Sequence, residues 1–421
     1  MNVLLAAAGT RGDVVPLVAL GEALRSRGHS VTLAAPPCFE AAASQLEFVA
    51  MGRDVEAWLR DEGSALSASP WSLFRLLNRA LRSELEAQFR LLPALSRDTD
   101  LIIGAGALVA GSSVARARGV PYRYAAFTPQ TIPSVHHMPT VLPFQGAPRW
   151  ANALAWRLCN RFYDWLLLPE LNRHRLQLNL TRASTVLEHF LPAGQVVLAV
   201  DPELSCSLDL GGVAMTGAWQ SKESEALPDE VRTFLGRGAR PIFAGFGSMP
   251  DPTPKQTAAV IIEAARRLGR PVILASTAEM NEPDVLVLRR PVSHARLFMG
   301  VDLVIHHGGA GTTSTAARSA APQVIVPHGG DQFGFARQAH RLGIAPAPFA
   351  RNRLTVDRLE NAIRSALTAQ TRQAASALSD VLRRREGCDR MVEHIESLNA
   401  PGCSDLSASR GWSCASAETR A

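Results

Sequence analysis

A glycine-rich turn in the second half of the sequence carries residue types that can bind a phosphate. The segment 306–313, HHGGAGTT, follows the expected strand 302–305 and opens a helical pattern. Glycines let backbone amides approach a phosphate closely, and the first turn of a helix adds unpaired N–H groups and a partial positive charge. A turn of this composition could also serve tight packing alone. It fits neither the dinucleotide-binding GxGxxG pattern nor a Walker A pattern.

Polar residues at two other strand–helix turns could complete such a site. Asp331 and Gln332 follow the apolar run 323–327. An acid and an amide at the carboxyl end of a parallel strand can hold vicinal sugar hydroxyls. Asp13 lies in a comparable turn after the first apolar run, residues 2–8. Taken alone, each aspartate is better explained as a helix cap.

The elements expected around these turns form an α/β fold with two doubly wound, Rossmann-like domains. Continuous apolar runs such as 2–8 are typical of strands buried on both faces of a parallel sheet. A helix with Pro16 in its first turn follows the first run, and a second strand–helix series begins at residue 241. The expected divisions are a first domain at 1–215, a linker at 216–240, a second domain at 241–400 and a disordered tail at 401–421.

Composition argues against several other classes of protein. With 421 residues, 47% hydrophobic and 19% charged, the chain suits two globular domains. Its formal charge of +6 suits an anionic ligand, but no Lys/Arg run is long enough for a nucleic-acid patch. The six cysteines form no CxxC pair. Neither a signal peptide nor a membrane-spanning stretch is expected, so the expected location is the cytoplasm.

These motifs, in this order, resemble the family 1 glycosyltransferases, which include plant and bacterial UDP-glycosyltransferases. The stretch 291–343 is similar to the family's donor-binding signature. The opening GTRGDVVP at 9–16 resembles the start of glycopeptide-antibiotic, sterol and rhamnolipid glycosyltransferases. The resemblance covers about residues 1–400, although roughly 55–210 match the family only in general character and not in specific motifs. It implies GT-B architecture, in which two Rossmann-like domains face each other across a cleft, the first for the acceptor and the second for a nucleotide sugar.

The resemblance assigns roles residue by residue. Asp13 matches the catalytic base of antibiotic and sterol members, where plant members carry a histidine. Asp331 and Gln332 match the pair that holds the donor sugar. The expected diphosphate contacts, with the Thr313 hydroxyl added for its chemistry, are Ser248, His307, Gly309, Gly311, Thr312 and Thr313.

The resemblance also places the nucleotide base, with one departure. The backbone of Val292 would pair with the base. Arg289 and Arg290 stand where many plant members place a tryptophan that stacks on uracil. An arginine can also stack on a base, so the choice between uracil and thymine stays open.

The implied activity is inverting transfer of a hexose from a UDP- or dTDP-sugar to a hydroxyl of a lipophilic natural product, sterol or lipid. No metal or other cofactor is expected, because His307, Ser248 and helix amides would stabilise the leaving diphosphate. The triplet Asp98-Thr99-Asp100 resembles a metal-binding DxD, but it precedes a strand instead of following one and is expected to be a solvated loop. Two alternatives stay open: a nucleotide-sugar isomerase or epimerase on this fold, and a catalytically silent partner protein.

Two further features concern the less readable first half. His136 and His137, in a proline-rich loop, could line the acceptor pocket, although solvent-exposed loop histidines are the simpler interpretation. A basic amphipathic helix face could touch a membrane, although packing as core and rim is the commoner use and membrane contact is not favoured. That face comprises Trp150, Leu154, Arg157, Leu158, Arg161, Phe162 and Trp165.

Overall fold

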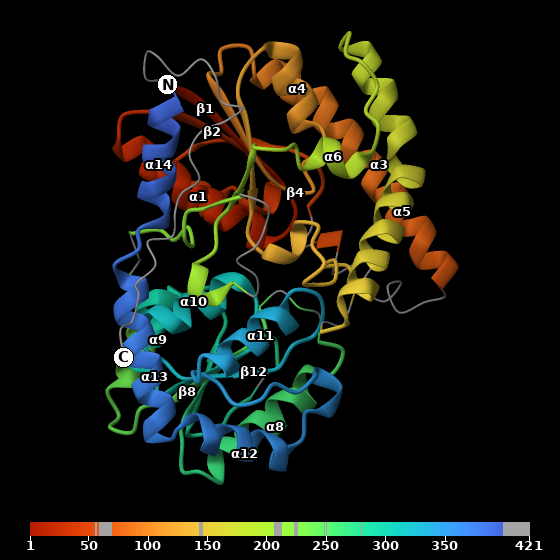
Figure 1. Cartoon of the computed structure of the whole chain (residues 1–421). Helices are drawn as coiled ribbons and strands as arrows, with labels where there is room; N and C mark the ends of the chain where they lie inside the picture. Colours follow the sequence, from red (N-terminus) through yellow and green to blue (C-terminus); the bar gives the residue numbers. More distant parts are fainter. Residues whose placement is uncertain are drawn as a thin grey trace, which may run out of the picture.

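The computed structural model contains two parallel α/β domains, one above the other in Figure 1. The seven strands of the first sheet lie in the order β3-β2-β1-β4-β5-β6-β7, and the five of the second in the order β10-β9-β8-β11-β12. The α/β GT-B architecture expected from the sequence is therefore confirmed. The structure describes residues 1–54, 57–58, 70–142, 146–205, 213–222, 226–247, 249, 251–278 and 280–398.

The first domain is built on a sheet that is buried on both faces. Its strands are β1 (Asn2–Ala8), β2 (Ser30–Ala35), β3 (Glu47–Ala50), β4 (Leu101–Gly106), β5 (Tyr122–Ala126), β6 (Val196–Leu198) and β7 (Ala214–Met215). Its helices are α1 (Arg11–Ser26), α3 (Pro70–Leu95), α4 (Gly111–Arg118), α5 (Arg149–Gln177) and α6 (Val186–Phe190). Successive side chains of β1 enter different cores: Leu5 joins the cluster that contains α1, and Leu4 the cluster with α3 and α5. This alternation explains why β1 is apolar from Val3 to Ala8.

The second domain repeats the plan with a smaller sheet. Its strands are β8 (Ile242–Gly245), β9 (Val272–Ala275), β10 (Val285–Leu288), β11 (Leu303–His306) and β12 (Gln323–Ile325). Its helices are α7 (Asp229–Leu235), α8 (Pro254–Arg266), α9 (His294–Gly300), α10 (Ala310–Arg318), α11 (Gln332–Arg341), α12 (Val356–Ala366) and α13 (Ala369–Arg383). Chain order reverses between β1 and β4 in one sheet and between β8 and β11 in the other. Ligands of such sheets bind beyond the carboxyl ends of the strands at these points.

The last described helix, α14 (Gly387–Leu398), returns to the first domain. Figure 1 shows it beside α1, and Met391, Val392 and Ile395 are fully buried in the cluster that contains α1. The division at residue 400 grouped this helix with the second domain. The packing differs from that grouping, because the buried side chains of the helix contact α1 of the first domain.

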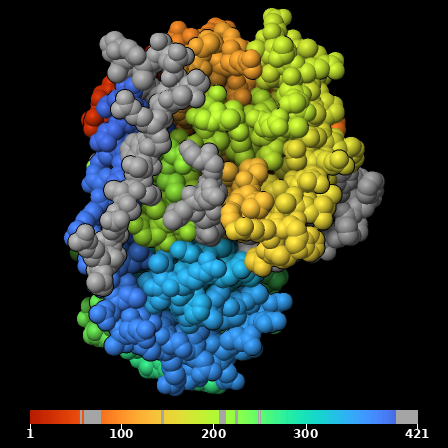
Figure 2. All heavy atoms as spheres, in the orientation of Figure 1, coloured from red at the N-terminus to blue at the C-terminus, as the bar shows by residue number. Residues whose placement is uncertain are grey.

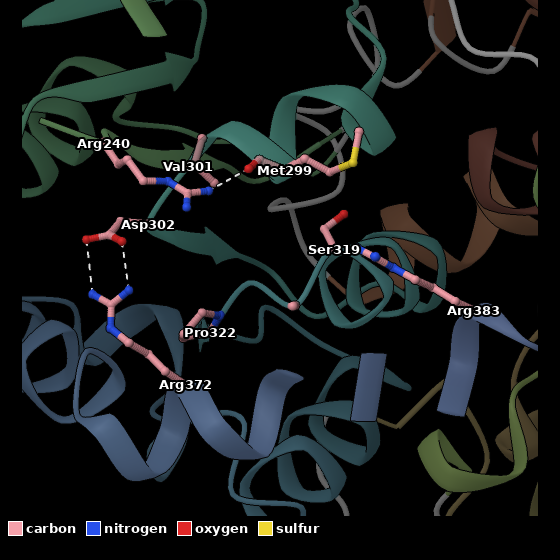
Figure 3. Close-up of a pocket in the computed structure, with 9 residues that line it drawn as sticks. Arg240, Met299, Val301, Asp302, Ser319, Pro322, Arg372 and Arg383 are labelled. Carbon is pink, nitrogen blue, oxygen red and sulfur yellow. Dashed lines mark hydrogen bonds and ion pairs between the residues drawn. The ribbon is translucent and has the colours of Figure 1, made fainter. Parts of the chain in front are cut away.

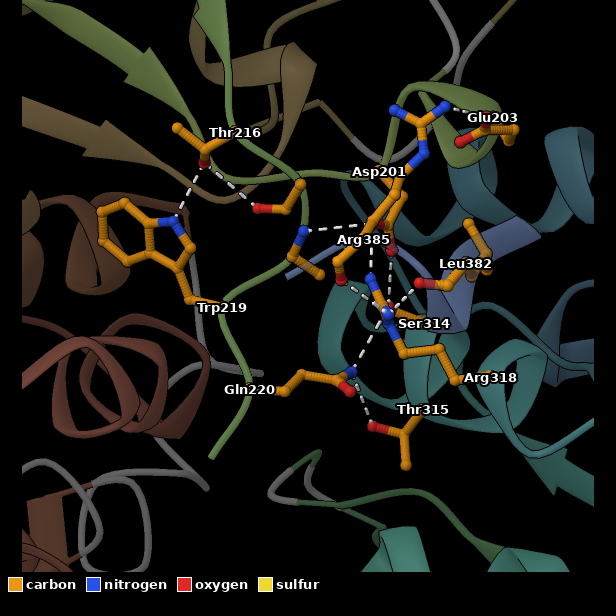
Figure 4. A network of polar contacts seen from close by, with 12 residues as sticks. Asp201, Glu203, Thr216, Trp219, Gln220, Ser314, Thr315, Arg318, Leu382 and Arg385 are labelled. Atoms are coloured by element: carbon orange, nitrogen blue, oxygen red, sulfur yellow. Dashed lines mark hydrogen bonds and ion pairs between the residues drawn. The ribbon is translucent and has the colours of Figure 1, made fainter. Parts of the chain in front are cut away.

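Polar contacts also cross between the domains on the side of α10. The Asp201 carboxylate is fully buried and accepts hydrogen bonds from Arg318 Nη2 at 2.6 Å and Ser314 Oγ at 2.9 Å (Figure 4). In the expected linker, the Gln220 amide donates to Thr315 Oγ1 at 3.1 Å. These contacts fix α10 relative to the first domain.

No helix in the described ranges is long and apolar enough to cross a membrane.

We expect Ile395→Ala to lower the free energy of unfolding by about 2–4 kcal/mol, because it leaves a cavity between α14 and α1. Urea unfolding measures the change. Glu393→Ala, an exposed position on the same helix, serves as the control and should change stability by less than about 0.5 kcal/mol. Equal effects of the two substitutions would contradict the packing of α14.

Candidate active site

The Asp13 carboxyl lies directly beyond the carboxyl end of β1. It packs so closely on Gly9 that a Cβ there would clash with Oδ2, and a Cβ on Gly106 would lie 3.1 Å from Cγ. Gly106, at the end of the adjacent strand β4, also has a φ of +63°, which favours glycine. Two neighbouring strand ends therefore form the walls around this carboxyl.

One oxygen of Asp13 is used for the fold and the other is open. Oδ2 accepts hydrogen bonds from Thr10 N at 2.9 Å and Thr10 Oγ1 at 3.4 Å, so the expected helix-capping role is present. Oδ1 accepts no hydrogen bond from the described residues. Burial raises the pKa of Asp13 from 3.8 to about 6, while the bonds from Thr10 act in the opposite direction.

His306 shapes the turn after β11 through its two ring nitrogens. Nε2 faces Gln323 Oε1 at 2.8 Å, and Nδ1 accepts the Gly308 amide proton at 3.0 Å. Burial lowers the pKa of this fully buried histidine to about 3, so the ring is neutral. Gly308 has a φ of +93°, and a Cβ there would lie 2.8 Å from Ile325 Cγ2. His306 was not among the predicted site residues. Its place as a polar residue at the end of an apolar strand could have indicated that it shapes the turn.

The first turn of α10 presents free backbone donors. The first helical hydrogen bond runs from Thr313 N to Gly309 O at 2.9 Å, and the structure gives the amides of residues 310–312 no partner among the described groups. Gly311 is exposed and Thr312 half-buried, as a phosphate site requires. Thr313 differs from the expectation, because its fully buried hydroxyl donates back to Gly309 O at 2.9 Å.

His307 lies beside these amides with an unused ring nitrogen. Its Nδ1 is buried without a hydrogen-bond partner in the described part of the chain. A Cβ on Gly309 would lie 2.6 Å from Nε2, and one on Gly247 would lie 3.1 Å from Cε1. Burial lowers the pKa of His307 to about 4, so it is a neutral donor at pH 7. The predicted Ser248 lies outside the described residues, directly after Gly247.

Asp331 and Gln332 occupy the next turn with different tasks. Gln332 Oε1 accepts the amide protons of His328 at 2.7 Å and Gly329 at 3.2 Å, so it shapes the turn, and its Nε2 contacts Met249 Sδ at 3.4 Å. Burial and the charge of Asp13 together raise the pKa of Asp331 to about 6. These two carboxyls come from different domains and lie close enough to interact electrostatically.

Comparison with known proteins agrees with this geometry. Residues 3–137 match the glycosyltransferase family 28 N-terminal domain, and residues 261–387 match the erythromycin biosynthesis protein CIII-like C-terminal domain. The chain is 34% identical over 401 residues to glycosyltransferase GtfE of Amycolatopsis orientalis, covering 90% of this chain and 93% of that protein. It is 33% identical over 403 residues to vancomycin aglycone glucosyltransferase of the same organism, covering 91% and 94%. The chain belongs to the family 1 glycosyltransferases.

A solved structure confirms the GT-B fold of this glycosyltransferase. Glycosyltransferase VinC in complex with DTDP superposes with a TM-score of 0.68 at 19% identity, covering 94% of this chain and 99% of the other. At that identity the likeness concerns the fold alone.

The remaining predicted residues of the glycosyltransferase lie in two other places. Arg289 is exposed directly after β10, and Val292 is half-buried just before α9. His136 is exposed, as the simpler interpretation expected. For His137 that interpretation is wrong: it is 3% exposed, and its carbonyl oxygen accepts a hydrogen bond from Trp156 Nε1 at 3.0 Å. His137 thus joins the proline-rich loop to α5.

A separate cavity of about 310 Å³ lies at the amino-terminal edge of the second sheet (Figure 3). Asp302, on its wall, precedes β11 and pairs with Arg372 at 2.8 and 3.1 Å. Open α/β sheets bind ligands at the opposite edge, so this cavity is not the active-site candidate.

We expect Asp13→Asn to raise stability at pH 7.5 by about 1–2 kcal/mol. The folded-state pKa lies above the unfolded value, so the ionised carboxylate destabilises the fold above pH 6, and this penalty disappears as pH falls toward 4. Asparagine can still accept from Thr10 N. Urea unfolding at pH 7.5 and pH 4.5 tests the gain and its loss, with the exposed Asp98→Asn as control. A variant less stable than the wild type at pH 7.5 would contradict the burial effect.

Substitution by alanine should affect stability very differently at Gly308 and Gly311. Gly308→Ala should cost about 2–4 kcal/mol, because of its positive φ and its contact with Ile325. Gly311→Ala meets no atom within 4 Å and should change stability by less than about 1 kcal/mol. Its methyl group would enter the space beside the free amides, so we expect weaker binding of UDP and dTDP in thermal-shift titrations. Unchanged nucleotide affinity would show that Gly311 does not lie at the diphosphate-binding site.

Proposed function

We propose that this enzyme transfers a hexose with inversion, and without a metal, from a UDP- or dTDP-sugar to a hydroxyl of a lipophilic small molecule. One observation carries the proposal. Asp13, which has one open carboxyl oxygen, belongs to one domain, and Asp331, whose pKa is raised by burial and by the charge of Asp13, belongs to the other. An acceptor hydroxyl held by the first domain and a donor sugar held by the second domain would meet between these two carboxyls.

Asp13 acts as the general base in this proposal. With a pKa of about 6 it is ionised at pH 7 and more basic than an ordinary aspartate. It is still a weak base for an alcohol, so proton transfer accompanies attack of the acceptor oxygen on C1 of the sugar. The nucleoside diphosphate leaves from the opposite face of C1, which inverts the anomeric centre.

The second domain stabilises the leaving diphosphate. The free amides at the start of α10 and the neutral His307 donate hydrogen bonds, and the helix dipole favours the developing negative charge. These donors would take the place of a metal ion. Asp331 would orient the sugar by accepting hydrogen bonds from its hydroxyls.

The substrate classes are supported by the relatives. Vancomycin aglycone glucosyltransferase, by its name, acts on an antibiotic aglycone, which supports a natural-product acceptor. The name of dTDP-epi-vancosaminyltransferase of Amycolatopsis orientalis, 31% identical over 403 residues, supports dTDP as a candidate beside UDP. The segment 289–292 would select between the bases.

The central test is turnover by Asp13→Asn. We expect kcat to fall by about 10²–10⁴ while nucleotide binding is retained, because only the proton acceptor is lost. Product formation from a UDP- or dTDP-sugar and a panel of lipophilic alcohols measures the effect. Asp98→Asn is the control and should keep full activity.

Three outcomes would contradict the proposal. Near-normal turnover in Asp13→Asn removes the base. Loss of activity in EDTA, restored by a divalent cation, contradicts metal independence. Conversion of the donor to an isomer without any acceptor favours the isomerase alternative.

A further inference from the structure

Exposed apolar side chains gather on one helix, α5. Ten large apolar side chains are exposed in the described ranges, and six of them lie on α5: Trp150, Leu154, Leu158, Phe162, Trp165 and Leu176. The indole rings are the most exposed, at 72% for Trp150 and 63% for Trp165. Packing as core and rim, the commoner use expected from the sequence, is therefore wrong for these residues. A concentration of exposed apolar surface marks an interaction site.

The exposed residues share a single face of α5. Their spacing of three and four residues from 150 to 165 places them in one stripe. The opposite face holds the helix to the first domain: Asn152 Nδ2 donates to Val135 O at 2.8 Å, and Leu167 and Leu171 are buried. Figures 1 and 2 show α5 on the outer flank of that domain. The stripe can therefore bind a partner without disturbing the fold.

Positive charge accompanies the stripe. Arg149, Arg157 and Arg161 are exposed in the first half of α5. Asp164, the one acid between residues 149 and 165, is half-buried and accepts the Val186 amide proton at 2.7 Å, so one of its oxygens is used within the fold. Beyond Trp165, a surface hollow of about 540 Å³ continues the face, with Asp164, Leu168, Leu176, Arg173 and Arg182 in its wall.

We propose that α5 docks this glycosyltransferase on an anionic lipid surface. The indole rings would lie at the level of the headgroups, the aliphatic side chains would enter the outer acyl region, and the arginines would meet lipid phosphates. Charge favours this occupant: the first half of α5 carries three exposed arginines and a single acid, the half-buried Asp164, on a chain of formal charge +6. Docking is independent of which sugar or acceptor the enzyme uses.

Vesicle flotation tests the proposal. The intact protein should bind vesicles of phosphatidylcholine containing one quarter phosphatidylglycerol at low salt, and bind more weakly in about 0.5 M salt, which screens the charges. Trp150→Ala/Trp165→Ala should lower the partition coefficient about tenfold or more. Arg157→Gln/Arg161→Gln should lower it about fivefold on the anionic vesicles and little on pure phosphatidylcholine.

Matched controls separate α5 from non-specific adhesion. Met299→Ala and Val381→Ala remove exposed apolar side chains of the second domain, 55% and 44% exposed, and should leave binding unchanged. Unchanged circular dichroism and melting temperature confirm that each variant is folded. Absence of binding at low salt, wild-type binding by the tryptophan variant, or equal losses in the controls would each overturn the proposal. A dimer that the tryptophan variant dissociates, without vesicle binding, would assign the face to a second copy instead.

Discussion

A buried ion pair between the domains fixes the relation of the two halves of the active site. Asp201, in the first domain, is fully buried and pairs with Arg318 and Ser314 of α10. Removing a carboxylate from water is costly, and only well-placed donors offset that cost, so the pair strongly favours one arrangement. The middle of α10 is thereby tied to the domain that carries Asp13, while its first turn offers free amides to the donor. The helix expected to hold the leaving group is positioned by the domain expected to hold the nucleophile.

Asp13 shows how one side chain can serve both fold and chemistry. Its Oδ2 closes the first turn of α1 by accepting from Thr10, which fixes the direction of Oδ1. The same confinement between two strand ends raises its pKa to about 6. A base in that range is ionised at neutral pH yet holds a proton more firmly than an exposed aspartate. The fold therefore carries the energetic cost of a buried charge at the place where the proposed reaction would use it, as is common at active sites.

Sequence reasoning succeeded where one local pattern had one structural solution. The run 2–8 had to be a buried strand because it is apolar at every position from Val3 to Ala8, and the turns after β1, β11 and β12 were placed correctly. It failed where the answer depended on contacts between distant segments. The inward turn of Thr313, the pairing of His306 with Gln323 and the return of α14 to α1 arise from tertiary packing. An apolar stripe on a helix likewise does not reveal what covers it: the stripe of α14 packs on α1, whereas that of α5 is exposed.

The binding residues of the second domain are easier to predict from the sequence than those of the first, for a chemical reason. Binding a diphosphate requires backbone donors and close approach, which only glycines and a helix start can provide, so the donor half leaves a recognisable sequence pattern. The lipophilic acceptor that we propose carries no group of comparable charge. It can be held by many combinations of apolar side chains, none of which imposes a fixed spacing. His137 illustrates the consequence: its residue type suggested binding chemistry, whereas its carbonyl and burial serve the contact between a loop and α5. The acceptor side therefore has to be inferred from exposure, packing and charge in the folded protein.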